Sequence, residues 1–140
     1  MNDALTIDAS VFVNAFSPTE RGSEQSWRFL AQIREAEIPV FVPTLMLVEV
    51  VASLARKQNN TTLAMEWMEE IQQLSFLTLI PLDDDLARES AVIAASHRLR
   101  GSDAVYVAVA RRFGAALVTL DSEQAQRAAP LVPVRLPASD

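Results

Sequence analysis

The sequence predicts a three-layer α/β/α fold built on a parallel sheet of about five strands. Short apolar segments alternate along the 140 residues with longer segments whose apolar residues recur at helical spacing. This alternation is typical of a parallel sheet with helices on both faces. Half of the residues are hydrophobic, and no repeat or low-complexity linker interrupts them. We therefore expect residues 1–140 to form a single domain.

The predicted strands are short, rich in aliphatic residues and bounded by turn residues. In chain order they are residues 5–7, 38–42, 76–80, 116–120 and 132–136. The first strand ends at Asp8, and the fourth leads into Asp121. The second strand holds Pro39 near its start and is closed by Pro43, two positions where the loss of an N–H group is tolerated.

The predicted helices lie between these strands and follow from apolar spacing and from the residues that bound each segment. They are residues 10–16, 23–35, 45–58, 61–74, 83–99, 103–113 and a brief helix after residue 121. Thr44 is a suitable cap for the third helix, and Asn59 and Asn60 separate it from the fourth. The fifth helix begins with three aspartates, which suit the positive end of a helix dipole.

One stretch is ambiguous, because the run VYVAVA at residues 105–110 would also suit a buried strand. Its flanks favour a helix. Ser102 is a good N-terminal cap, two arginines fill a last turn, and Gly114 suits the position just past a helix end. We therefore predict a buried helix over residues 103–113.

Four acidic residues occupy positions that suit a ligand site. Asp8 and Asp121 follow strands, Asp103 begins a helix, and Glu49 lies in the apolar segment LMLVEVVA, where a bare carboxylate is expensive. Ligands of open parallel sheets bind beyond the carboxyl ends of the strands. The four acids thus predict a hard-cation site with oxygen ligands. Each aspartate also suits a helix cap, and Glu49 could instead pair with an arginine or reach the surface, so a structural alternative stays open.

Three stretches of the sequence resemble a known family. They are TIDASVFV with Asp8 and Ser10, PTLMLVEVVASL with Glu49, and LRGSDAVYVAVARRFGAALVTLD with Asp103 and Asp121. In order and local context they are similar to the PIN-domain ribonucleases, and among them to the VapC-like toxins of toxin–antitoxin pairs. The resemblance covers essentially the whole chain. It implies that the four acids are catalytic and hold Mg²⁺ or Mn²⁺, and that Ser10 hydrogen-bonds at the site.

The resemblance also implies the activity and the partners. The expected activity is metal-dependent hydrolysis of RNA phosphodiesters, and the expected partners are a cognate antitoxin and a second copy of the chain. Divalent cations suit this reaction because they activate water and neutralise charge on the phosphoryl oxygens, so no Ser–His pair is required. His97, the single histidine, is expected to be structural. The candidates for binding substrate phosphates are the arginines that flank the Asp103 helix, namely Arg98, Arg100, Arg111 and Arg112.

Composition limits the function classes. The net charge of −6 argues mildly against a nucleic-acid partner, although a metal-binding cluster of acids would distort this count. The absence of cysteine excludes disulfides, a thiol nucleophile and Cys-based zinc sites. No apolar run is long enough to span a membrane and no secretion signal begins the chain, so we expect a cytoplasmic protein.

Two alternatives stay open within the same family. One is a noncatalytic PIN module that acts through protein contacts, and the other is a housekeeping RNA-processing PIN nuclease. A signalling receiver domain is disfavoured, because it needs paired acids after the first strand and a lysine after a late strand. Here Asp8 is followed by Ala9 and Ser10, and Lys57, the only lysine, lies on a predicted middle helix.

Overall fold

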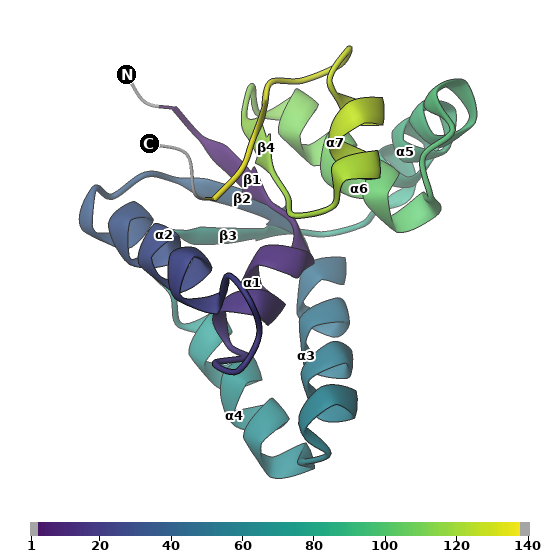
Figure 1. Ribbon diagram of the computed structural model, residues 1–140. Helices are drawn as coiled ribbons and strands as arrows, with labels where there is room; N and C mark the ends of the chain where they lie inside the picture. The colour runs from purple at the N-terminus through teal and green to yellow at the C-terminus, as the bar shows by residue number, and fades with distance from the viewer. Residues whose placement is uncertain (1–2, 138–140) are drawn as a thin grey trace.

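The computed structural model describes residues 3–137 and contains a five-stranded sheet at its centre (Figure 1). The strands are β1 (Leu5–Ile7), β2 (Val40–Pro43), β3 (Leu77–Ile80), β4 (Ala116–Val118) and β5 (Val134–Arg135). Their order in the sheet is β3-β2-β1-β4-β5, and all four neighbouring pairs are parallel. The predicted α/β class with a parallel sheet of five strands is confirmed.

Helices cover both faces of this sheet. They are α1 (Ala9–Ala15), α2 (Ser23–Glu35), α3 (Leu45–Gln58), α4 (Thr61–Gln72), α5 (Asp84–His97), α6 (Gly101–Arg112) and α7 (Ser122–Ala128). Helices α1 to α4 lie on one side of the sheet, with α3 and α4 projecting away from it, and α5, α6 and α7 lie on the other (Figure 1). Among residues 3–137, no helix is long and apolar enough to cross a membrane.

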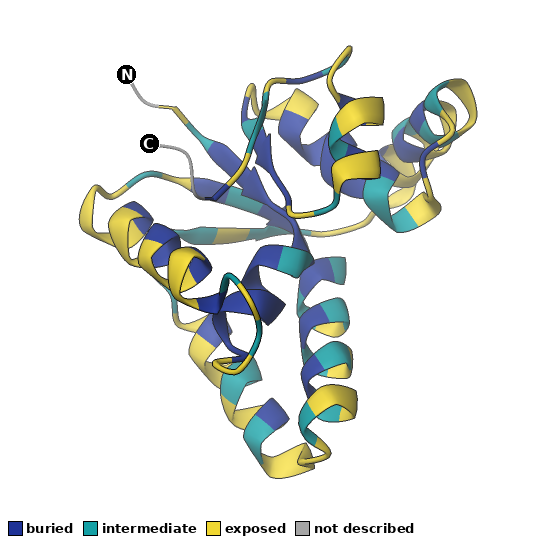
Figure 2. Cartoon of the chain, viewed as in Figure 1, coloured by how far each residue is buried: buried dark blue, intermediate teal, exposed yellow. Residues whose placement is uncertain are grey.

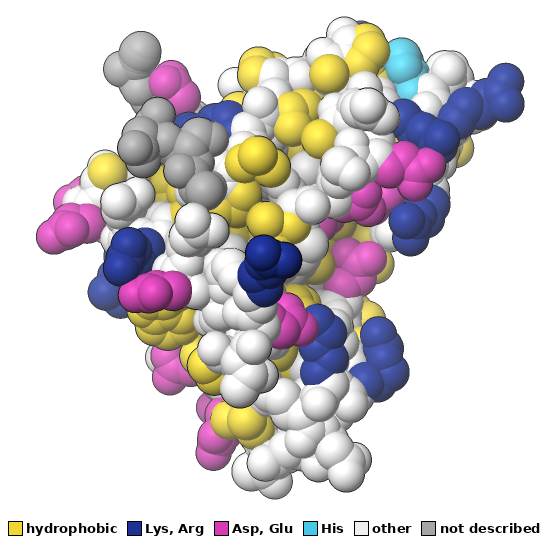
Figure 3. Space-filling model, in the orientation of Figure 1, with side chains coloured by type: hydrophobic (Ala, Val, Ile, Leu, Met, Phe, Trp, Pro, Cys, Tyr) yellow, Lys and Arg dark blue, Asp and Glu magenta, His cyan; other side chains and the backbone are white. Residues whose placement is uncertain are grey.

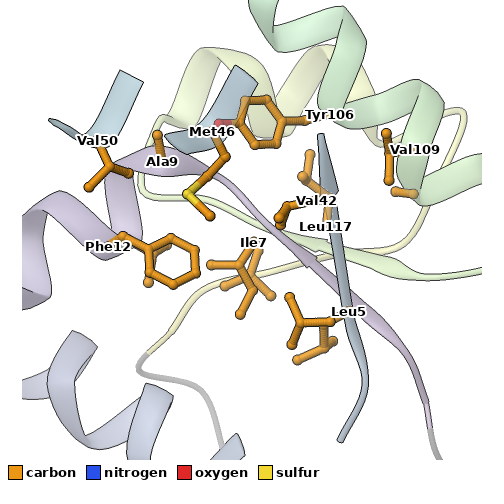
Figure 4. Close-up of a cluster of buried hydrophobic side chains, with 14 of the residues drawn as sticks. Leu5, Ile7, Ala9, Phe12, Val42, Met46, Val50, Tyr106, Val109 and Leu117 are labelled. Carbon is orange, nitrogen blue, oxygen red and sulfur yellow. The ribbon is translucent and has the colours of Figure 1, made fainter. Parts of the chain in front are cut away.

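The core lies on both sides of the central strand β1. Leu5 and Ile7 on one face of β1 are 1% and 0% exposed, and Thr6 on the other face is also fully buried. Burial of both faces explains why the strands of a parallel sheet read as continuous apolar runs. Figure 2 shows the same concentration of buried residues in the sheet and in the inner faces of the helices. Figure 4 shows Phe12 and Tyr106, two large side chains of this core.

The ambiguous stretch at residues 105–110 lies within α6 and is buried, so it is the buried helix that its flanks predicted. Gly114 follows this helix with a positive φ of 61°, the backbone conformation expected just past a helix end. The predicted cap at Ser102 is wrong. The helix begins earlier, because the backbone of Arg100 is extended and Arg100 occupies the cap position.

A second predicted cap is also wrong. Thr44 precedes α3, but its backbone is already helical, with φ of −55° and ψ of −26°, and its side chain forms no capping hydrogen bond. A capping side chain normally projects from extended backbone, which directs its oxygen back toward the first free N–H groups. The last strand, predicted over residues 132–136, is limited to Val134–Arg135.

The strand order creates a crevice at one edge of the sheet. From β1 the chain proceeds to β2 and β3 on one side, whereas β4 and β5 lie on the other. The connections therefore diverge between β1 and β4, and the ends of these two strands border the crevice where open α/β folds bind ligands. Asp8 follows β1 and Asp121 lies shortly after β4, so two of the four predicted acids are at this point.

Candidate functional site

Asp8 is held at the junction of β1 and α1. Its N–H donates to the carbonyl oxygen of Val118 at 2.9 Å, which joins the end of β1 to the end of β4. Its Oδ2 accepts from the backbone N–H of Ser10 at 3.0 Å, so Asp8 caps α1. Burial raises the pKa of Asp8, since desolvation disfavours the charged form; the hydrogen bonds from Ser10 oppose this, and the carboxylate of Asp121 adds to it.

Ser10 and Thr119 fix the loop that follows β4. The Oγ of Ser10 accepts from the N–H of Leu120 at 3.1 Å, and the Oγ1 of Thr119 accepts from the N–H of Asp121 at 3.0 Å. Thr119 Oγ1 also lies 2.7 Å from Gln124 Oε1 and 3.4 Å from Asp8 Oδ2. A hydroxyl has a single proton, so the shorter contact to Gln124 is its hydrogen bond. The hydrogen bond from Leu120 to Ser10 therefore joins the loop that carries Asp121 to the loop that carries Asp8.

Asp121 has a structural partner on one oxygen and a charged partner on the other. Oδ1 caps α7, because it accepts from the N–H groups of Glu123 at 2.9 Å and Gln124 at 3.2 Å. Oδ2 lies 3.8 Å from Nη2 of Arg100. The helix-cap interpretation of Asp121 is therefore correct, and it uses only Oδ1, so that Oδ2 faces the cation Arg100.

Glu49 lies half-buried on the side of α3 that faces the crevice. Its Oε1 accepts from the hydroxyl of Tyr106 at 2.7 Å, and the ring of Tyr106 is fully buried beside Met46 (Figure 4). Although the segment around Glu49 is apolar in sequence, a single face of α3 packs into the core, and Val48 is 66% exposed. Burial raises the pKa of Glu49, as does the nearby carboxylate of Asp8, whereas the hydroxyl of Tyr106 lowers it.

Asp103 lies in the first turn of α6, and its charge interacts with all three other acids. Desolvation by burial is the main effect that raises its pKa, from 3.8 to about 6. The carboxylates of Asp8, Asp121 and Glu49 raise this pKa further, and the guanidinium of Arg100 opposes them. Nε of Arg100 is 4.0 Å from Oδ2 of Asp103. Arg100 therefore bridges Asp103 and Asp121.

These residues line or border one cleft of about 620 Å³. Asp8, Glu49 and Asp103 line the cleft directly, and Asp121 borders it through Arg100. Within residues 3–137, no group of three or more acidic or histidine side chains is arranged closely enough to hold a metal ion. The donor set nonetheless fits a hard cation, since it consists of carboxylate oxygens that mutually disfavour ionisation. Their convergence on a common metal position stays a prediction.

A comparison with known families is consistent with this arrangement. The family model of the PIN domain matches residues 5–130. The chain belongs to the PIN domain family. The match contains all four acids of the cleft, as well as every strand except the last, β5.

Individual proteins also resemble this chain over most of their length. Ribonuclease VapC3 from Pyrobaculum aerophilum is 28% identical over 132 residues, which cover 91% of this chain and 97% of that protein. Mycobacterium tuberculosis VapC20, described as a Sarcin-Ricin loop cleaving toxin, has a TM-score of 0.77 and 19% identity, and the match covers 94% of this chain and 98% of that one. VapBC2 from Rickettsia felis, bound to a DNA fragment from its promoter, has a TM-score of 0.71 and 13% identity, with 95% and 98% covered. These two structural likenesses show a shared fold.

The PIN domain does not bring all the predicted arginines to the cleft. Arg98 is exposed just after α5 and borders a smaller pocket that also contains Arg100 and Asp103. Arg111 and Arg112 end α6, whereas Asp103 begins it, so roughly 12 Å of helix separates them. Arg112 is paired with Glu89 at 3.1 Å. Of the four arginines, Arg100 alone lines the cleft.

Further residues of this PIN domain, outside the predicted set, contact or adjoin the predicted acids. Tyr106 orients Glu49, and its position three residues after Asp103, on the same face of α6, was a signal that could have found it. Thr119 fixes the loop that carries Asp121, because its Oγ1 accepts from the N–H of Asp121 and donates to Oε1 of Gln124. Asn14 is buried in the cleft wall, where its Nδ2 donates to the carbonyl oxygen of Arg21 at 3.0 Å.

Proposed function

We propose that the protein is a metal-dependent endoribonuclease and the toxin of a type II toxin–antitoxin pair. The observation that carries the proposal is the electrostatic coupling of four carboxylates near the point where the chain connections diverge between β1 and β4. The pKa of Asp103 is raised by the charges of the other three. Such a cluster is costly unless it serves a cationic ligand, since like charges disfavour each other's ionisation. Membership of the PIN domain family and the names of VapC3 and VapC20 support hydrolysis of RNA.

In this proposal Asp8, Glu49, Asp103 and Asp121 hold Mg²⁺ or Mn²⁺. When bound, such cations supply activation of water and neutralisation of charge on the phosphate. The chain itself positions the ligands. Ser10 donates to Asp8 through its N–H, and the hydroxyl of Tyr106 fixes the direction of the Glu49 carboxylate. Because Tyr106 is enclosed in the core, Glu49 is held by a rigid part of the fold.

Arg100 has two roles in the proposed reaction. In the structure it neutralises Asp103 and Asp121 from outside, and its side chain is 73% exposed and free to move. Once cations occupy the carboxylates, the guanidinium loses these partners and can instead bind a phosphate oxygen of RNA. Arg98 is placed to add positive charge next to it. Arg111 and Arg112 are assigned no contact with the phosphate that is cleaved.

The proposed partners are an antitoxin and a second copy of the chain. Several structural neighbours are toxin–antitoxin complexes, among them FitAB bound to a DNA fragment and VapBC from Salmonella typhimurium bound to DNA. An antitoxin that shields the cleft would keep the nuclease inactive. An RNA substrate and such an antitoxin would place the protein in the cytoplasm.

The decisive experiment compares the wild type with Asp8→Asn on a panel of RNAs, with magnesium, with manganese and with a chelator. Asparagine keeps the size and the hydrogen bond from Ser10 but removes the charge, so cleavage should fall by orders of magnitude while the protein stays folded. Asp85→Asn is a matched control, because Asp85 is an exposed residue on α5 that does not line the cleft.

Equal cleavage by the wild type and Asp8→Asn would indicate a contaminating nuclease. An absence of cleavage on every RNA, together with an absence of growth arrest on expression, would contradict the proposal. That result would favour a noncatalytic PIN module. Growth that is unaffected by expression, with clear metal-dependent cleavage of one RNA precursor, would instead favour a housekeeping RNA-processing enzyme.

A further inference from the structure

The cleft does not end at the carboxylates but continues along α3 to a basic end. Glu49, Ala52, Ser53 and Arg56 all line it, and their spacing of three, four and seven residues places them on one face of the helix. On the right of Figure 3, acidic side chains lie where α3 begins, and basic side chains lie farther along the same helix. One wall of the cleft therefore changes from negative to positive along its length.

Arg56 is the free cation at this end of the cleft. It is exposed and forms no ion pair with any residue between 3 and 137. Its neighbour Lys57 is paired with Glu20, and Glu20 also accepts from Nδ2 of Asn14 at 3.3 Å. Glu20 thus neutralises Lys57 and is itself held by a buried residue of the cleft wall. The guanidinium of Arg56 is left without a counter-charge of its own.

The spacing along α3 matches a strand that runs past the carboxylates. Seven residues of helix place Arg56 about 10 Å from Glu49 along the axis. The residues between them on this face, Ala52 and Ser53, are small and leave the wall open. A polymer with a negative charge on each unit can therefore lie with one unit at the carboxylate end and a neighbouring unit at Arg56. The planar guanidinium suits a phosphate group, which it can bind through two parallel hydrogen bonds.

We propose that Arg56 binds a backbone phosphate of the RNA strand beside the one that is cleaved, so that the strand runs along α3 from Glu49 toward Arg56. This inference rests on the proposed function, because it takes the carboxylate end as the place of cleavage. An acidic protein segment fits less well, since its carboxylates would meet Asp8, Glu49 and Asp103 at the other end of the same cleft.

The first test measures binding without cleavage. A fluorescently labelled single-stranded RNA of about twelve nucleotides is titrated in chelator, at a series of salt concentrations, against the wild type, Arg56→Gln and Arg56→Lys. Loss of one charged hydrogen-bonding contact should weaken binding about tenfold at low salt. The slope of log affinity against log salt should become shallower by about one unit in Arg56→Gln and stay unchanged in Arg56→Lys. Arg28→Gln on α2 is the matched control, because Arg28 is exposed and its partner is Glu24 on the same helix.

The second test separates binding from chemistry. With magnesium present, Arg56→Gln should raise KM for the same RNA and leave kcat unchanged, since the contact is made equally in the ground state and the transition state. A dinucleotide is too short to reach Arg56, so its hydrolysis should be the same in the wild type and in the variant. Arg28→Gln should match the wild type on both substrates.

The outcomes distinguish this inference from the proposed function. If the wild type cleaves RNA and Arg56→Gln binds and cleaves as well as Arg28→Gln, the inference is wrong and the function stands. If RNA binding depends on Arg56 but the wild type cleaves nothing in magnesium, the phosphate site stands and the proposed function is wrong. If Arg56→Gln loses binding of poly-L-glutamate and keeps binding of RNA, the basic end serves a protein partner and the inference is overturned.

Discussion

Arg100 is the residue whose role depends most on what occupies the cleft. Its guanidinium lies 4.0 Å from Asp103 and 3.8 Å from Asp121 but remains 73% exposed. Exposed ion pairs of this kind contribute at most about 1 kcal/mol to stability, because solvent screens them and the long side chain loses entropy. The contribution of Arg100 to folding is therefore small. Its larger effect is to occupy, with a positive charge, the region where a divalent cation would bind.

We predict that Arg100→Gln binds Mn²⁺ more tightly than the wild type and binds RNA more weakly. Removal of the competing charge should improve Mn²⁺ affinity roughly three- to tenfold, the effect expected for a screened charge near a surface. Isothermal titration calorimetry without RNA measures the Mn²⁺ affinity, and fluorescence anisotropy measures the RNA affinity. Arg98→Gln removes a neighbouring charge that has no carboxylate partner within residues 3–137, so its Mn²⁺ affinity should change less. An unchanged Mn²⁺ affinity in Arg100→Gln would show that Arg100 does not compete with the metal.

At the scale of the secondary-structure elements, Asp121 joins β4 to α7. It caps α7 and is also a proposed metal ligand, and a pair of substitutions can separate these two roles. Its Oδ1 caps α7 and its Oδ2 faces Arg100. Asparagine retains an oxygen that can cap a helix but lacks the charge, whereas alanine retains neither. We predict that Asp121→Asn is about 1 kcal/mol more stable than Asp121→Ala, because the cap alone separates them. Both should lose most of their Mn²⁺ affinity.

Denaturant unfolding in chelator measures the stability of these two variants, and calorimetry measures their Mn²⁺ binding. If the two variants are equally stable, the capping hydrogen bonds do not stabilise α7. If Asp121→Asn binds Mn²⁺ as well as the wild type, Asp121 is not a metal ligand. Asp83, which caps α5 through the N–H of Leu86, offers a control: Asp83→Ala should be less stable but should bind Mn²⁺ normally.

The elements themselves could be predicted because local signals determine them. The alternation of apolar runs with helical spacing identified all five strands and all seven helices that residues 3–137 contain, and Gly114 marked the end of α6. Their exact starts depend on backbone conformation. Thr44 and Ser102 have the right chemistry for caps, but Thr44 already has helical backbone and Ser102 lies inside the first turn of α6.

The sequence predicted the site residues that follow strand ends. It did not predict the contacts that form only when distant helices pack together. Asp8 and Asp121 follow from topology alone, because parallel strands end at one edge of the sheet. The partner of Glu49 does not, since Tyr106 lies 57 residues away and meets Glu49 only after α3 and α6 have packed. Arg111 and Arg112 are close to Asp103 in the sequence, but they lie at the opposite end of α6 and do not line the cleft.

At the scale of the whole molecule, the packed core holds several carboxylates close together, and their mutual repulsion lowers the stability of the folded protein. Burial raises the pKa of Asp8, Glu49 and Asp103, and at least one neighbouring carboxylate raises each of these pKa values further. The core that surrounds them, with Ile7, Val42 and Tyr106 fully buried, keeps the crevice from relaxing to separate the charges. A divalent cation that binds only the folded protein would recover this free energy, because binding to the native state alone stabilises it.

The pH dependence of stability tests this coupling. Asp103 has a pKa of about 6 when folded against 3.8 when unfolded, so the folded protein binds the proton more tightly. A carboxyl group of this kind stabilises the fold below its unfolded pKa, and the contribution is lost as pH rises through the folded value. In chelator, the free energy of unfolding should therefore fall between about pH 4 and about pH 7, with Asp103 contributing at most about 3 kcal/mol, because solvent screens its half-buried carboxylate. Raised pKa values at Asp8 and Glu49 act in the same direction.

Metal should oppose this loss, because it binds the ionised carboxylates. We predict that magnesium or manganese stabilises the protein strongly at about pH 7 and hardly at all at about pH 4, where protons occupy the ligands. Denaturant unfolding across this range, with chelator and with metal, measures both curves. Asp103→Asn should flatten the curve in chelator and reduce the stabilisation by metal, whereas Asp85→Asn on the exposed face of α5 should leave both unchanged. A wild-type stability in chelator that rises from pH 4 to pH 7 would mean that these carboxylates are ionised at no cost, and the clustered site would then be wrong.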